Sequence, residues 1–149
     1  DVLANHDGIK AWHQAYPAPN LHSPLVFDLH DDSIPASKST QKPYDVVFTA
    51  NTLHIIAWPL VEKLFALVGE SLSDDGKFVV YGPFNENGNY ISEGNSQFDR
   101  MLRQSDTKMG IRDKEGVIAL ARTNKLTLRQ IYSMPANNQL LVFVNTVVD

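Results

Sequence analysis

Short apolar segments of β-strand composition alternate along this chain with longer segments of helical periodicity. We expect strands at residues 25–29, 44–50, 77–81, 126–134 and 140–148, and helices at residues 2–15, 59–72, 92–104 and 113–124. Residues 73–76 are expected to form a turn, and the short connection at 135–138 predicts that the last two strands pair as a hairpin. The alternation predicts an α/β fold: a mostly parallel sheet with helices on both faces, closed by a C-terminal antiparallel hairpin.

The composition narrows the class of protein. The chain has 149 residues, which suits one domain, and a net charge of −4. It contains no cysteine, which excludes disulfides, a thiolate zinc site and a cysteine nucleophile and fits a reducing compartment. No apolar run reaches the roughly 20 residues that span a bilayer, and the negative charge gives no general attraction to nucleic acid. We therefore expect a cytoplasmic protein that binds neither membranes nor nucleic acid.

The start of the sequence is unusual. It begins at Asp1, and its first methionine is Met101. No basic segment followed by an apolar segment, as in a secretory signal, stands at the start. We expect a fragment of a longer protein, or a chain whose upstream part was lost. The absence of upstream strands would leave a sheet edge exposed, and such an edge would favour a homodimer.

Several well-known motifs do not occur in the sequence. It lacks both nucleotide-binding patterns, G-x-G-x-x-G and G-x-x-x-x-G-K-[ST], and the G-x-S-x-G of serine hydrolases. It also lacks the Tyr-x-x-x-Lys pair that a short-chain reductase would use. The five histidines have no metal-binding spacing. We therefore expect no metal site.

The strongest local signal follows the expected strand at 44–50. In α/β sheets, ligands bind beyond the carboxyl ends of the strands, and Asn51 and His54 stand directly at this position. An unperturbed histidine titrates near neutrality, so His54 suits a general base. The alternative is a structural histidine, hydrogen-bonded at a strand-to-helix turn.

Other segments carry weaker signals, each with a structural alternative. Residues 81–90 are rich in aromatic and amide side chains, which suit the walls of a ligand site, whereas a glycine-rich surface loop is the alternative. Asn137 and Asn138 either contact a ligand or serve turn geometry. Basic residues exceed acidic ones over 101–149, so Arg103 and Arg112 either hold an anionic substrate or belong to solvated faces.

Five stretches occur together in an order that is typical of one family: residues 44–55, residues 81–85, Ser92-x-x-Asn95-x-x-Phe98-Asp99, Gly110-Ile111-Arg112-Asp113 and residues 134–138. On these motifs, which cover essentially the whole chain, the sequence resembles the class I S-adenosylmethionine-dependent methyltransferase-like family, a former domain of unknown function that includes methyltransferase-like protein twenty-six. The resemblance implies a Rossmann-like methyltransferase sheet. Family members carry a first strand and a glycine-rich loop upstream of Asp1. The resemblance therefore implies a single, incomplete, N-terminally truncated domain over residues 1–149.

The resemblance also implies a function, S-adenosyl-L-methionine-dependent methyl transfer to an unidentified small molecule. The positions that match the family's cofactor site are Asp1 at the ribose, Asp28 near the adenine, and Asn51, Thr52 and Leu53 near the methyl group. His54 would be the catalytic base and Asn51 would orient the acceptor. The implied substrate-binding residues are Trp58, Tyr81, Phe84, Asn85, Asn137 and Arg112, the last for an anionic acceptor. The alternative function is a non-catalytic binding or scaffold module with a methyltransferase fold.

Overall fold

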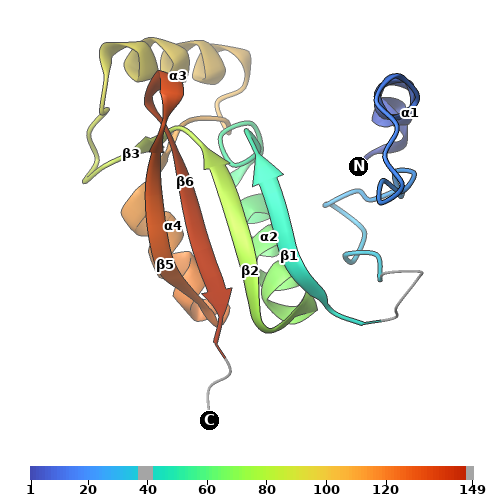
Figure 1. Ribbon diagram of the computed structural model, residues 1–149. Helices are drawn as coiled ribbons and strands as arrows, with labels where there is room; N and C mark the ends of the chain where they lie inside the picture. The colour runs from blue at the N-terminus through green and yellow to red at the C-terminus, as the bar shows by residue number, and fades with distance from the viewer. Residues whose placement is uncertain (37–41, 147–149) are drawn as a thin grey trace. The chain divides into compact units, whose positions relative to one another are not determined.

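The computed structural model describes residues 1–36 and 42–146 (Figure 1). The chain divides into two units, of which the first is Asp1–Ala36 and the second is Ser37–Asp149. Across the described residues, no helix combines the length and the apolar character needed to cross a membrane.

The first unit is built on one helix. A 3₁₀ turn, η1 (Leu3–Asn5), leads into α1 (His6–Ala15), close to the helix expected at 2–15. The strand expected at 25–29 is wrong: this segment is in no strand, and its long-range backbone hydrogen bonds to described residues go to Asp1. The Asp1 N–H donates to the Leu25 carbonyl and the Phe27 N–H donates to the Asp1 carbonyl, each at 3.0 Å. With one neighbouring residue, no ladder of hydrogen bonds can form.

The second unit is built on a four-stranded sheet with the order β1-β2-β6-β5 (Figure 1). Its strands are β1 (Tyr44–Ala50), β2 (Leu72–Gly82), β5 (Leu126–Met134) and β6 (Asn138–Asn145). β1 and β2 are parallel, whereas β6 is antiparallel to both of its neighbours. The hairpin is therefore confirmed, but the mostly parallel pairing is wrong, because β6 lies between β2 and β5 and makes both of its pairings antiparallel.

Two strand boundaries differ from those expected. The turn expected at 73–76 lies inside β2, where these residues bulge out between the pairs Tyr44–Leu72 and Val46–Lys77. β6 begins at Asn138 rather than at 140, because the 3₁₀ turn η2 (Pro135–Asn137) makes the connection very tight. Residues 147 and 148 of the expected strand lie outside the described residues.

The helices of this unit do not cover both faces of the sheet. α2 (Trp58–Ser71) packs on β2 and α4 (Lys114–Thr123) on β5, and both lie on the same face (Figure 1). α3 (Glu93–Ser105) crosses instead above the edge where β1 and β2 end. The expectation of helices on both faces is therefore wrong within residues 42–146. The opposite face carries exposed apolar side chains such as Val46 and Phe48.

The core lies between the sheet and the helices α2 and α4. Phe65 of α2 packs edge-on against Phe78 of β2 and Phe143 of β6, with ring centroids 5.0 and 5.9 Å away. All three rings are fully buried. Two short strands that were not expected, β3 (Phe84–Asn85) and β4 (Arg112–Asp113), pair in parallel beyond the main sheet. They tie the chain after β2 to the start of α4.

The aromatic cluster predicts a large effect of truncation on stability. We expect Phe65→Ala to lower the free energy of unfolding by about 3–5 kcal/mol, because it removes a fully buried ring and leaves a cavity. Urea unfolding followed by circular dichroism measures this change. Phe48→Ala is the matched control: its ring is 62% exposed, so we expect a change within about 0.5 kcal/mol. Equal effects of the two substitutions would contradict the assigned core.

Candidate functional site

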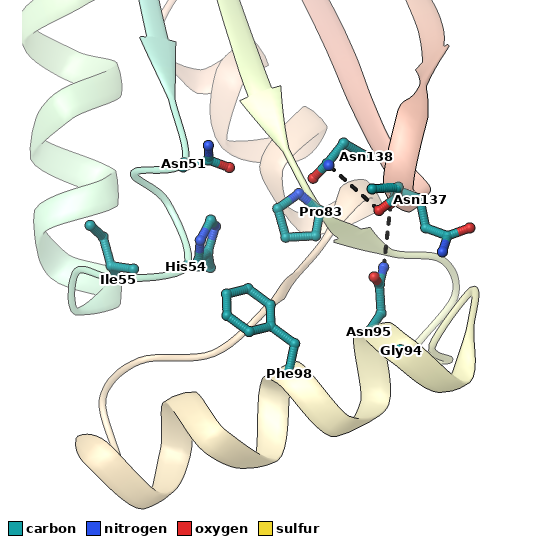
Figure 2. A pocket seen from close by; sticks show the side chains of 10 residues that line it. Asn51, His54, Ile55, Pro83, Gly94, Asn95, Phe98, Asn137 and Asn138 are labelled. Atoms are coloured by element: carbon teal, nitrogen blue, oxygen red, sulfur yellow. Dashed lines mark hydrogen bonds between the residues drawn. The ribbon is translucent and has the colours of Figure 1, made fainter.

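A pocket of about 650 Å³ opens where β1 and β2 end (Figure 2). Four segments line it: the end of β1, the residue after β2, helix α3 and the β5–β6 connection. The structure thus brings together Asn51, His54 and Asn137, three residues selected from the sequence. The other lining residues are Ile55, Pro83, Gly94, Asn95, Phe98, Ala136 and Asn138.

His54 is the titratable residue of this pocket. Its side chain is buried, and its ring meets the Phe98 ring edge-on with centroids 5.4 Å apart (Figure 2). Neither ring nitrogen has a hydrogen-bond partner among residues 1–36 and 42–146, whereas a structural histidine at this turn would be expected to have one. Burial lowers the pKa of His54, and the positive charge of Arg112 lowers it further. At neutral pH the ring is therefore uncharged and has a free nitrogen that can accept a proton.

The loop that carries His54 begins with a strained residue. Asn51 has a positive φ of 54°, a conformation that asparagine tolerates better than most residues. Its N–H donates to the Tyr81 carbonyl at 2.9 Å, which continues the β1–β2 pairing by one step. The Asn51 carboxamide makes no hydrogen bond with the described residues and extends toward the side of the hairpin (Figure 2).

Arg112 holds this loop from outside the pocket. Its guanidinium donates to the carbonyls of Leu53 at 3.0 Å, Ile56 at 2.6 Å and Lys108 at 2.9 Å. It also lies over the Trp58 ring, 5.8 Å from the ring centroid. Arg112 and Trp58 line a separate pocket of about 290 Å³. The structure therefore places Arg112 and Trp58, which were expected to bind substrate, outside the lining of the pocket at Asn51 and His54. Backbone carbonyls engage the Arg112 guanidinium.

Asp99 of α3 directly follows the pocket residue Phe98 and was not among the site residues expected from the sequence. Its carboxylate is 1% exposed and accepts hydrogen bonds from the Ile111 N–H at 2.6 Å, the Tyr90 hydroxyl at 2.7 Å and Arg103 Nε at 2.8 Å. Burial alone would raise the pKa of Asp99, but these hydrogen bonds outweigh it and lower the pKa. The signal in the sequence was the spacing of Asn95, Phe98 and Asp99, which places all three within one helical turn.

Residues 110–112, which we call the clamp segment, connect α3 with the His54 loop. Ile111 binds Asp99 and Arg112 binds the loop carbonyls, as described above. The first residue of the segment also binds this loop, because the Gly110 N–H donates to the His54 carbonyl at 2.9 Å. Gly110 has a φ of 147°, and a Cβ there would overlap the Arg103 guanidinium. Glycine is therefore required at this position.

The remaining residues selected from the sequence lie outside the lining of this pocket. Phe84 is fully buried, and Asn85 is buried in the β3–β4 pair, where its Oδ1 has no hydrogen-bond partner among the described residues. Tyr81 is half-buried in β2. The Thr52 hydroxyl bonds to Thr49 at 2.7 Å and to the Ala50 carbonyl at 3.1 Å, while the Leu53 side chain is buried.

The first unit holds the two carboxylates that were expected to bind a cofactor. Asp1 Oδ1 accepts from the Val2 N–H at 2.7 Å and Asn5 Nδ2 at 2.8 Å, and Asp28 Oδ1 accepts from the His30 N–H at 2.9 Å. In each carboxylate the second oxygen has no partner within the described part of the chain. Such an oxygen can accept from a ribose hydroxyl or an amine, so each of these hydrogen-bond acceptors fits a nucleoside. The described residues contain no cluster of three or more His, Cys, Asp or Glu that could hold a metal ion.

The proximity of Arg112 to His54 predicts a measurable change in protonation. We expect Arg112→Gln to raise the pKa of His54 toward 6.5 without fully restoring it, because the substitution removes the positive charge but leaves the burial. A titration of the His54 ring protons by NMR measures this shift. The group's pKa is lowered by folding, so its contribution to stability is present above the unfolded value of about 6.5 and is lost as the pH falls through the folded value.

The control for this titration is Arg100→Gln, which removes the same charge from the exposed side of α3, where Arg100 bonds to Ser96 and Glu93. We expect no change in the pKa of His54 for this variant. An equal shift in both variants would show that the long-range charge of the protein, and not the Arg112 contact, sets the protonation.

Comparisons with known proteins agree with this architecture. The structure matches an O-methyltransferase family protein from Burkholderia thailandensis with a TM-score of 0.81 at 12% identity, covering 100% of this chain and 43% of that one. It matches human N-acetylserotonin methyltransferase, solved in complex with SAM, with a TM-score of 0.69 at 13% identity, covering 90% and 36% of the two chains. The chain therefore spans less than half the length of these proteins. At such identities the likeness shows a class I methyltransferase-like fold.

A family model gives the assignment by sequence. The family described as "Protein of unknown function (DUF938)" matches residues 2–145, nearly the whole chain. The chain belongs to the DUF938 family.

Proposed function

We propose that the protein is an S-adenosylmethionine-dependent methyltransferase that acts on a small molecule, with His54 as its general base. The observation that carries this proposal is the buried, uncharged His54 ring, which lines a pocket at the carboxyl edge of β1 and β2. Its nitrogens have no hydrogen-bond partner among the residues that the structure describes. The likeness to methyltransferase folds, one of them solved with SAM, supports the choice of cofactor.

The cofactor would supply an activated methyl group on a positively charged sulfur, and the acceptor would take this methyl group and give up its proton. The chain would supply position and proton acceptance. In the second unit, the Asn51 carboxamide at the end of β1 makes no hydrogen bond with the described residues. In the first unit, taken by itself, Asp1 and Asp28 have carboxylate oxygens that could accept from a ribose hydroxyl. His54 would accept the proton of an acceptor hydroxyl through a ring nitrogen. Phe98 and Ile55 would provide an apolar wall that limits water beside this proton.

The proposal can be tested at the level of the cofactor. Calorimetric titration of the full-length protein with S-adenosylmethionine is expected to show saturable heat. The absence of both heat and a thermal shift at millimolar cofactor would contradict the proposal. Saturable binding without turnover of any acceptor would favour the alternative of a non-catalytic binding module.

His54→Gln separates the role of a base from that of a structural residue. We expect turnover to fall by ~100- to 10,000-fold with little change in cofactor affinity, because glutamine keeps a polar side chain but cannot accept the proton. In the unsubstituted protein, kcat/KM should rise with pH through the lowered pKa of His54 and reach a plateau above it. The variant should lose this rise.

His13→Gln, a substitution on α1 outside the pocket lining, is the control and should retain the activity and its pH profile. Circular dichroism checks that both variants are folded. A His54→Gln protein with an unchanged pH profile would show that another group titrates.

A further inference from the structure

We infer that the pocket at the ends of β1 and β2 selects an acceptor that is uncharged at neutral pH, has a flat apolar ring and carries a hydroxyl group. This inference rests on the proposed function and adds the class of substrate. It replaces the anionic acceptor that Arg112 suggested in the sequence.

The first support is the lining of the pocket. None of its ten residues is an aspartate, glutamate, lysine or arginine. The polar side chains are four asparagines, Asn51, Asn95, Asn137 and Asn138, together with His54. Carboxamides both donate and accept hydrogen bonds, so they recognise polar neutral groups without balancing a charge. A charged ligand would lose its hydration here without gaining a counter-ion.

The second support is that Asp99 and Arg112, the charged groups that adjoin or bond to the lining segments as described above, are already engaged. The Asp99 carboxylate has three donors, from Tyr90, Arg103 and Ile111. The Arg112 guanidinium is occupied by the carbonyls of Leu53, Ile56 and Lys108. Moving either group toward a ligand would break hydrogen bonds in the clamp segment and leave buried partners unsatisfied. These charges therefore maintain the shape of the pocket and are not available for recognition.

The third support is the form of the apolar wall. The Phe98 ring stands edge-on to His54, and Ile55 and Pro83 add apolar surface to the pocket (Figure 2). Ala136 also lines the pocket. Such walls accept a planar ring, since aromatic faces and edges pack well against one another. The free Asn51 carboxamide and the His54 ring nitrogens supply the polar contacts. Asn95 and Asn138 use their Nδ2 groups on backbone carbonyls, at 3.5 and 3.1 Å, and keep their oxygens for a donor on the ligand.

The test compares two probes of nearly equal shape, 4-hydroxybenzamide and 4-hydroxybenzoate, on the full-length protein at pH 7.5. Chemical-shift changes in NMR spectra measure their affinities in the presence of S-adenosylhomocysteine. We expect the neutral amide to bind at least about tenfold more tightly than the carboxylate, with shifts at Asn51, Asn95 and Phe98. Equal or tighter binding of the carboxylate, or no binding of either probe, would overturn the inference.

A variant inverts the expected preference. Ile55 lines the pocket and is 46% exposed, so Ile55→Lys places a cation at its rim without burying it. We expect this variant to bind 4-hydroxybenzoate several-fold more tightly than the unsubstituted protein. Ile91→Lys, the same change outside the pocket lining, is the control and should leave both affinities unchanged. An equal gain in both variants would also overturn the inference.

These measurements report binding and not turnover, so they separate two kinds of failure. If the amide binds as expected but no methyl transfer occurs, the proposed function fails and the recognition of neutral ligands stands. If methyl transfer occurs but the preferred acceptors are anionic, the inference fails and the proposed function stands.

Discussion

The geometry of the pocket depends on the hydrogen bond that the Ile111 N–H donates to the Asp99 carboxylate. It joins α3, which forms one wall, to the clamp segment at Ile111. The residues on either side of Ile111 then hold the opposite wall, Gly110 through the His54 carbonyl and Arg112 through the carbonyls of Leu53 and Ile56. Three consecutive residues therefore fix the distance between helix α3 and the His54 loop. The two walls are far apart in the sequence.

A buried carboxylate is normally costly, and its persistence here has a physical explanation. Removing a charge from water costs several kcal/mol, on the order of what a good set of hydrogen bonds returns. Asp99 recovers this cost from Tyr90, Arg103 and the Ile111 N–H. A substitution that kept the shape but removed the charge would leave these donors weakly bonded. Asp99 therefore ties α3 to the clamp segment, whose Gly110 N–H bonds to the His54 carbonyl.

The sequence predicted the local elements well because their causes are local. The periodicity of apolar residues indicated α2, α3 and α4 within one or two residues, and β1 and β5 matched their expected ranges. The position of Asn51 and His54 at a ligand edge followed from the rule that strand ends collect binding residues. The strand expected at 25–29 was wrong because its pairing depends on a neighbour, and a sequence pattern does not report which neighbour is present.

The site could be predicted only in part, since its decisive contacts are remote in sequence. Arg112 reaches Leu53 across 59 positions, so an arginine in a basic region looked like a ligand for an anion. Phe84 and Asn85 looked like a binding loop, yet the unexpected β3–β4 pairing buries both. Asn95 and Phe98 line the pocket only because α3 crosses above the sheet edge, and the order of the strands determines that crossing.

The same contacts that fix the pocket also determine its electrostatic character. Hydrogen bonding by backbone carbonyls orients the Arg112 guanidinium without neutralising it, so its charge still acts on His54 at short range. The charge disfavours protonation of His54. Burial of the ring, which packs edge-on against Phe98, removes the water that would stabilise its charged form. The binding of Arg112 to the loop carbonyls therefore both keeps its charge out of the pocket lining and favours the uncharged form of His54. If Arg112 turned to bind an anion, its hydrogen bonds to the Leu53 and Ile56 carbonyls would break. The neutralised charge would then no longer lower the pKa of His54.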